Sequence, residues 1–226
     1  MADVTSQGVL GAIARKNVAS SGGIAYVDSA ETYNSFSSGP TVNYPTVSEN
    51  DIMLAWAVSN DNHNTTGTPP TGWTKILEVD GTYQSVSVFW KRAGASEPSS
   101  EAWTSIFDAI EQSAWEVLAY SGCVNSGSPI DNSFSESSGF DAAKDIASTS
   151  VNNNSMGVAC FATSAGTAFP FTFDGGIMER VDANLGSALN VAIGDSVVET
   201  AGAYSLGGDY SSATFAVEAV VGLIPQ

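Results

Sequence analysis

An internal repeat constrains the fold of this chain more than any other feature of its sequence. Residues 46–55 align with residues 150–159 at an offset of 104 (150 − 46), and residues 115–122 align with residues 215–222 at an offset of 100 (215 − 115). A drift of this kind is what insertions and deletions in the loops between repeated strands produce. The repeat therefore predicts two halves with similar structures.

Alternation of apolar side chains indicates that the repeated segments are β-strands. Ile52, Leu54 and Trp56 fall on one face of such a strand, and Val86 and Val88 share a face of another. The expected strands cover residues 51–59, 73–80, 84–92 and 113–121 in the first half, and 155–163, 176–183, 187–199 and 212–223 in the second. Four strands bury too little surface to fold alone. We therefore expect an all-β fold, a jelly-roll β-sandwich of about eight strands over residues 41–226, with 123–148 as a loop-like crossover.

Residues 1–40 have no partner in the repeat, so they form a separate N-terminal arm. The arm carries Tyr26, Val27, Tyr33 and Phe36 but too little apolar surface to bury these side chains on itself. Two alternatives remain open. The arm reaches a neighbouring subunit or capsid surface through strand addition or inserted rings, or it completes the sandwich of its own chain.

The charge balance excludes several classes of partner. The chain of 226 residues has 7 basic and 24 acidic residues, which gives a net charge of −17. So few basic residues cannot neutralise a row of phosphates, so we expect no nucleic-acid binding. The same balance argues against docking on an anionic membrane, and no apolar run approaches the ~18–20 residues of a spanning helix.

Catalytic and metal-binding patterns are weak in this sequence. His63 is the only histidine and follows Asp61 in a loop rich in Asn, where the two could share a cation, although a turn is the favoured interpretation. No Gly-x-Ser-x-Gly motif marks a hydrolase. We predict no enzymatic activity, no catalytic residue, no metal and no cofactor. Glu116 and Glu218 are expected to face outward from their strands.

Tryptophan and cysteine positions favour core packing. Trp56, Trp90 and Trp115 lie among apolar neighbours, which predicts burial. Trp103 lies in a polar stretch and is the best candidate for an exposed ring that could stack on a sugar. Cys123 and Cys160 are expected to be buried thiols rather than a disulfide.

Four motifs resemble a β-sandwich domain that recurs in virion proteins of tailed phages. The resemblance is good over residues 46–122 and looser in the second half, where Gly176-Ile177-Met178 replaces the Gly-Trp-Thr triplet. The motifs are Asn50-Asp51 before an apolar strand, Pro69-Pro70-Thr71-Gly72-Trp73-Thr74, Lys91-Arg92-Ala93-Gly94-Ala95-Ser96-Glu97-Pro98, and Leu118-Ala119-Tyr120-Ser121-Gly122.

This resemblance implies a non-enzymatic virion structural protein, in particular a capsid decoration (cement) protein that stabilises the outer head surface. It implies the major capsid protein or another virion protein as partner, a homotrimer, and a place on the virion surface after assembly in the host cytoplasm. The alternative is a carbohydrate-binding module or a tail or fibre surface protein used in host attachment. The predicted interaction residues are Tyr26, Val27, Tyr33, Phe36 and Trp103.

Overall fold

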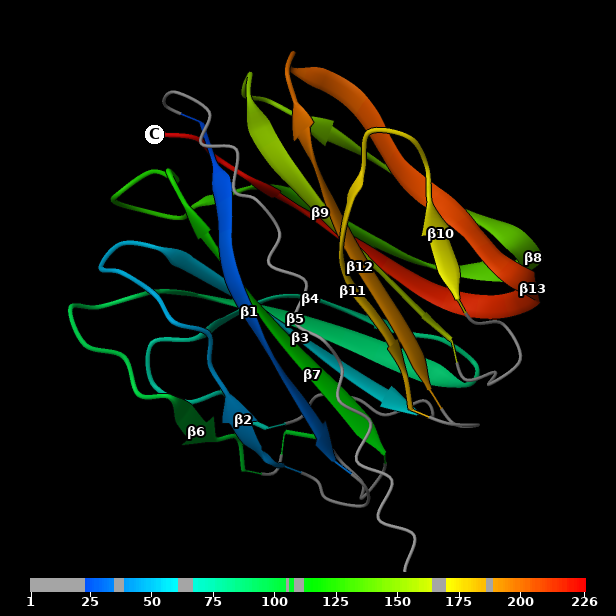
Figure 1. Ribbon diagram of the computed structural model, residues 1–226, viewed down its shortest axis with the longest axis horizontal. Coiled ribbons are helices and arrows are strands. Elements are labelled where there is room, and N and C mark those ends of the chain that lie inside the picture. Colours follow the sequence, from blue (N-terminus) through cyan, green and yellow to red (C-terminus); the bar gives the residue numbers. More distant parts are fainter. Residues whose placement is uncertain are drawn as a thin grey trace, which may run out of the picture.

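The computed structural model describes residues 23–34, 39–60, 67–104, 106–107, 112–163, 170–185 and 189–226. Throughout this part the chain is all-β, as the sequence predicts, and its antiparallel strands form a β-sandwich (Figure 1). No helix in the described part is long and apolar enough to cross a membrane. Phe36, Asp61 and His63 lie outside the described residues.

The first half of the chain builds one sheet, in the strand order β1-β7-β3-β5-β4. Two short strands, β2 and β6, pair with each other outside this sheet. The strands of this half are β1 (Ala25–Asn34), β2 (Thr41–Asn43), β3 (Ile52–Asn60), β4 (Thr74–Asp80), β5 (Gln84–Arg92), β6 (Ser100–Ala102) and β7 (Ser113–Ser121).

The second half builds the facing sheet, in the order β10-β13-β9-β12-β11, with β8 also paired to β13. Figure 1 shows the two sheets as separate layers, with the second half at the upper right. The strands are β8 (Ile130–Ser150), β9 (Ser155–Thr163), β10 (Phe171–Phe173), β11 (Met178–Asn184), β12 (Asn190–Val198) and β13 (Gly202–Leu223).

Equivalent strands of the two halves occupy equivalent places, as the repeat predicts. The order β7-β3-β5-β4 in the first sheet corresponds to β13-β9-β12-β11 in the second, and β1 and β8 add the next strand on the same side of each. Among the described strands, each sheet takes its members from one half of the chain. This arrangement is a β-sandwich. The jelly-roll order of strands stays a prediction.

Two segment boundaries expected from the sequence are wrong. Strand β1 belongs to the sandwich and pairs with β7 over its whole length, so residue 40 does not separate an arm from the sandwich. Residues 25–34 thus follow the second alternative and complete the sheet of their own chain. The expected crossover at 123–148 is also wrong, because β8 forms a long ladder with β13 from Ile130 onward.

The main core lies between the two sheets. One face of each central strand points into it, because successive side chains in a strand alternate between faces. Its fully buried members include Ile52, Leu54, Trp56, Val58, Val86, Val88 and Leu118 from the first sheet, and Val158, Cys160, Val191, Ile193, Val217, Ala219 and Val221 from the second.

Each sheet is also covered on its outer face, so the molecule has two further apolar cores. Outside the first sheet, Val42 on β2 and Trp103 beyond β6 pack on Ala55, Phe89 and Trp115. Outside the second sheet, β10 and the first part of β13 cover β9 and β12. Strand β3 is therefore buried on both faces, which explains its nearly unbroken apolar sequence.

Candidate functional site between the sheets at the β1 edge

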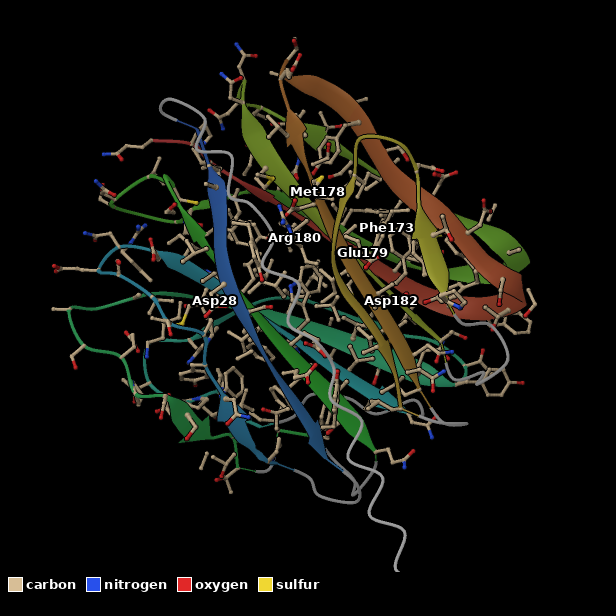
Figure 2. All side chains as sticks on the ribbon, in the orientation of Figure 1. Asp28, Phe173, Met178, Glu179, Arg180 and Asp182 are labelled. Carbon is tan, nitrogen blue, oxygen red and sulfur yellow. The ribbon has the colours of Figure 1, made fainter. Side chains whose placement is uncertain are left out.

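A group of buried polar side chains lies inside the sandwich where β1 and β7 face β11 and β12. Arg180 stands at a β-bulge in β11, where the register with β12 shifts between Glu179 and Val181. A bulge redirects a side chain relative to regular pleating. Figure 2 shows Arg180 on the β1 side of β11, whereas Phe173 lies toward β10.

Arg180 forms a two-pronged ion pair with Asp195 on the neighbouring strand. Its Nε donates to Oδ2 of Asp195 at 2.7 Å, and its Nη2 donates to Oδ1 at 2.9 Å. The side chain of Asp195 is 2% exposed and that of Arg180 is 13% exposed. Burial works to lower the pKa of Arg180, but the hydrogen bonds and charge of Asp195 raise it above its usual value. The guanidinium therefore stays charged inside the sandwich.

Tyr120 connects this ion pair to the opposite sheet. Its hydroxyl donates to Oδ2 of Asp195 at 3.0 Å, so a residue of β7 is bound to a residue of β12. Burial, reinforced by the negative charge of Asp195, raises the pKa of Tyr120 well above its usual value. Tyr120 is therefore a neutral hydrogen-bond donor, and the contact joins the two sheets.

Tyr26 covers the ion pair from β1. The Arg180 guanidinium lies 4.3 Å from the centre of the Tyr26 ring, within the range of a cation–π interaction. The same ring packs edge-on against Tyr120, with 6.0 Å between the ring centres, and its hydroxyl donates to Ser29 at 2.8 Å. Arg180, Asp195, Tyr120 and Tyr26 together are called the inter-sheet clasp below.

A second polar group lies further along β1 and β7. Glu31 is directly opposite Glu116 in the strand pairing, so both side chains are on the same face. Glu116 is 1% exposed, and burial raises its pKa to about 8. The negative charge of Glu31 acts in the same direction, whereas a hydrogen bond with Tyr33 acts against it. Glu116 therefore holds its proton at neutral pH.

The expectation that Glu116 and Glu218 face outward is wrong. Glu116 lies on the core face of β7, in phase with Ala114 and Leu118, and Glu218 is 1% exposed beside Phe161 in the β9–β13 pairing. Strand alternation does not reveal this, because both faces of these strands are buried.

The predicted exposure of Trp103 is also wrong. Its ring is fully buried, 4.9 Å from Trp115 and 5.1 Å from both Trp73 and Phe89, measured between ring centres. Its indole N–H donates to the hydroxyl of Tyr44 at 2.9 Å. The polar neighbours of Trp103 in the sequence belong to the covering β2–β6 pair, which folds the ring inward. A ring in this position cannot stack on a sugar.

The other predicted interaction residues in the described part do not form one surface. Tyr26 packs on the main core, and Val27 packs on the outer core of the first sheet. Tyr33 is 42% exposed, and its hydroxyl donates to Glu31 at 2.8 Å. Of the tryptophans expected in the core, Trp56 and Trp115 are fully buried and Trp90 is half-buried.

Arg180 and Asp195 were not singled out from the sequence. A signal for Asp195 was nonetheless present, because it follows Val191 and Ile193 at the spacing of a core-facing strand residue. An acidic side chain in that phase requires a buried partner. The partner could not be named from the sequence, since Arg180 reaches it only through the bulge.

Among the described residues, no three His, Cys, Asp or Glu side chains come together in a way that could hold a metal ion. Cys123 and Cys160 are both buried and unbonded to each other, as expected. At the β1 edge, Tyr120 and Tyr26 of the first sheet contact Asp195 and Arg180 of the second, and Glu116 is protonated at neutral pH.

Comparisons with models of protein families, with curated proteins and with solved structures found no match for this chain. The resemblance of its motifs to phage virion domains remains a prediction.

Proposed function

We propose that this chain is a non-enzymatic structural protein of a tailed-phage virion, and that it acts as a decoration (cement) protein on the outer surface of the head. The proposal rests on one observation. Three of the four motifs that carry the resemblance to virion domains, spread over residues 50–97, build a single connected unit at one end of the first sheet, and their roles in it are structural.

The Gly-Trp-Thr segment forms the first part of this unit. Gly72 has a φ of +92°, a conformation that favours glycine, and the backbone N–H of Trp73 donates to the carbonyl of Pro70 at 3.1 Å. The Trp73 ring is 6% exposed, and its indole N–H donates to the Tyr44 hydroxyl at 3.0 Å. The turn thus inserts Trp73 into the outer core of the first sheet.

The segment that begins at Lys91 forms the second part. Lys91 pairs with Oε2 of Glu97 at 2.7 Å, and the backbone N–H of Gly94 donates to Oε1 of the same carboxylate, also at 2.7 Å. Burial works to raise the pKa of Glu97, but these two contacts lower it overall. The Lys91 side chain runs beside Gly72, where an added Cβ would lie 3.2 Å from its Cε.

The Asn50-Asp51 segment completes the unit. Asn50 has a φ of +74°, and its backbone N–H donates to the carbonyl of Ala93 at 2.9 Å. The N–H of Ala93 in turn donates to the carbonyl of Asp51 at 2.8 Å. These three motifs are therefore held together by direct contacts.

The charge of the chain suits a protein that covers a capsid. A net charge of −17 keeps free copies soluble and apart before assembly. We place the protein on the virion surface after assembly in the host cytoplasm, bound to the major capsid protein or another virion protein. A homotrimer suits the threefold positions of a head, because oligomers are commonly closed and cyclic.

Binding to capsids tests this function. Purified protein is mixed with expanded heads of tailed phages, and the heads are sedimented and heated with and without it. We expect stoichiometric co-sedimentation, a higher melting temperature of the heads, and a trimer by sedimentation equilibrium. Failure to bind heads, together with specific binding on a glycan array, would replace the proposal with the host-attachment alternative.

A further inference from the structure

The pair Glu31 and Glu116 lies where the N-terminal strand joins the sandwich. Strand β1 is at the edge of its sheet, and its ladder partner in that sheet is β7. Along the inner face of this seam, Glu31 stands opposite Glu116 and Tyr33 stands opposite Ala114. Two carboxyl groups directly across a strand pair repel each other when both are charged.

The Tyr33 hydroxyl contacts both carboxyl groups but has only one proton to donate. The Tyr33 hydroxyl donates to Oε2 of Glu31 at 2.8 Å and is also hydrogen-bonded to Glu116. A hydroxyl has one proton to give. Both contacts are satisfied when Glu116 carries its own proton and donates it to the Tyr33 oxygen. If Glu116 loses that proton, one hydroxyl faces two negative carboxylates.

The other described residues around Glu116 do not stabilise a negative charge on its carboxyl group. Its Oε1 atom is buried and has no hydrogen-bond donor among the described residues. Trp56 on β3 is its cross-strand partner, and the indole N–H of Trp56 makes no hydrogen bond within the described part of the chain. From the opposite sheet, the titratable group that senses its charge is Cys160 on β9, whose pKa is raised by burial and by Glu116. No cation of the described part is paired with Glu116.

We propose that Glu116, Tyr33 and Glu31 form a proton-controlled latch on β1, which holds the strand against β7 while Glu116 is protonated and loosens it when the proton leaves. Opening β1 exposes Glu116 to water, because β1 covers its side of β7. Acidic conditions hold the strand closed and alkaline conditions release it.

The sign of the pH dependence follows from the two states of Glu116. In the closed state its pKa is about 8, and in the open state we take the ordinary carboxyl value of 4.5. Below 4.5 both states are protonated, so closure is strongest. Between these values only the closed state holds the proton, so each pH unit favours opening about tenfold. Above pH 8 both states are ionised and the effect levels off.

Hydrogen exchange followed by mass spectrometry tests the latch on the full chain. The exchange rate of peptides from β1 is divided by the intrinsic chemical rate at each pH, and peptides from β5 serve as the internal control. We expect the protection of β1 to fall about 100-fold from pH 5.5 to 7.5 while β5 changes far less. A parallel loss in β1 and β5 would overturn the latch, because it would report global unfolding.

Matched variants show whether Glu116 causes the pH dependence of β1 protection. Glu116→Gln keeps the shape of the side chain without a proton to lose, so β1 protection should become independent of pH. Glu31→Gln removes the facing charge at an exposed position, so the fall should level off at a lower pH. Glu49→Gln, at an exposed position away from this seam, makes the same change in net charge and should leave the profile unchanged. An unaltered profile in both Glu116→Gln and Glu31→Gln would overturn the proposal.

Discussion

Removing either half of the Arg180–Asp195 ion pair should destabilise the sandwich more than removing both. Asp195→Ala leaves a guanidinium inside the protein without its carboxylate. Arg180→Met leaves a carboxylate that is 2% exposed and still accepts a hydrogen bond from the Tyr120 hydroxyl. Breaking a buried ion pair from one side costs about 3–5 kcal/mol, because an uncompensated charge stays behind. We expect each single variant to lose about 3 kcal/mol or more of its free energy of unfolding.

The double variant distinguishes a buried pair from two independent contacts. With both charges removed, no uncompensated charge remains, so its loss should be smaller than either single loss, and the coupling energy should therefore exceed about 3 kcal/mol. The more exposed pair Lys75–Glu78 on β4 is the matched control, with side chains 35% and 20% exposed. Its coupling should be about 1 kcal/mol or less, because water screens such pairs.

Urea unfolding measures these values, followed by tryptophan fluorescence and by circular dichroism. Coincident transitions and an unchanged dependence on urea concentration would show that the free energies are comparable. A coupling energy below about 0.5 kcal/mol for Arg180 and Asp195 would refute the reasoning. It would mean that the pair is effectively solvated rather than buried.

Three further predictions follow from burial and backbone geometry. Trp103→Ala should lower the free energy of unfolding by about 3–5 kcal/mol in urea titrations, since it empties a ring-sized space in a packed core, and it should leave glycan-array signals unchanged. Gly122→Ala should cost about 1–3 kcal/mol in melting experiments, because φ is +77° and the new Cβ would lie 2.5 Å from the carbonyl oxygen of Gly23; a neutral result would contradict that close approach. Burial raises the pKa of Cys123 to about 12 and that of Cys160 above its usual value, so a thiol reagent should label neither in the native protein and both in urea. Rapid labelling before unfolding would disprove their burial.

The strands themselves were predictable because their signal is local. Alternation of apolar side chains depends on neighbours a few residues apart, so β3, β5, β7 and β9 could be located from the sequence within about two residues. The repeat likewise predicted that corresponding strands of the two halves would take corresponding places, since similar segments bury their faces in similar ways.

The tertiary structure alone decided which residues face which partners. Glu116 and Trp115 alternate along β7, and both faces of that strand are buried, so periodicity could not say that Glu116 points to the main core. Trp103 has polar sequence neighbours, but β2 and β6 fold it beneath their own surface. Arg180 meets Asp195 through a bulge, and meets Tyr26 only because β1 joins the sheet edge opposite β11. These contacts join segments far apart in the chain, and they depend on how two sheets pack, which no local pattern encodes.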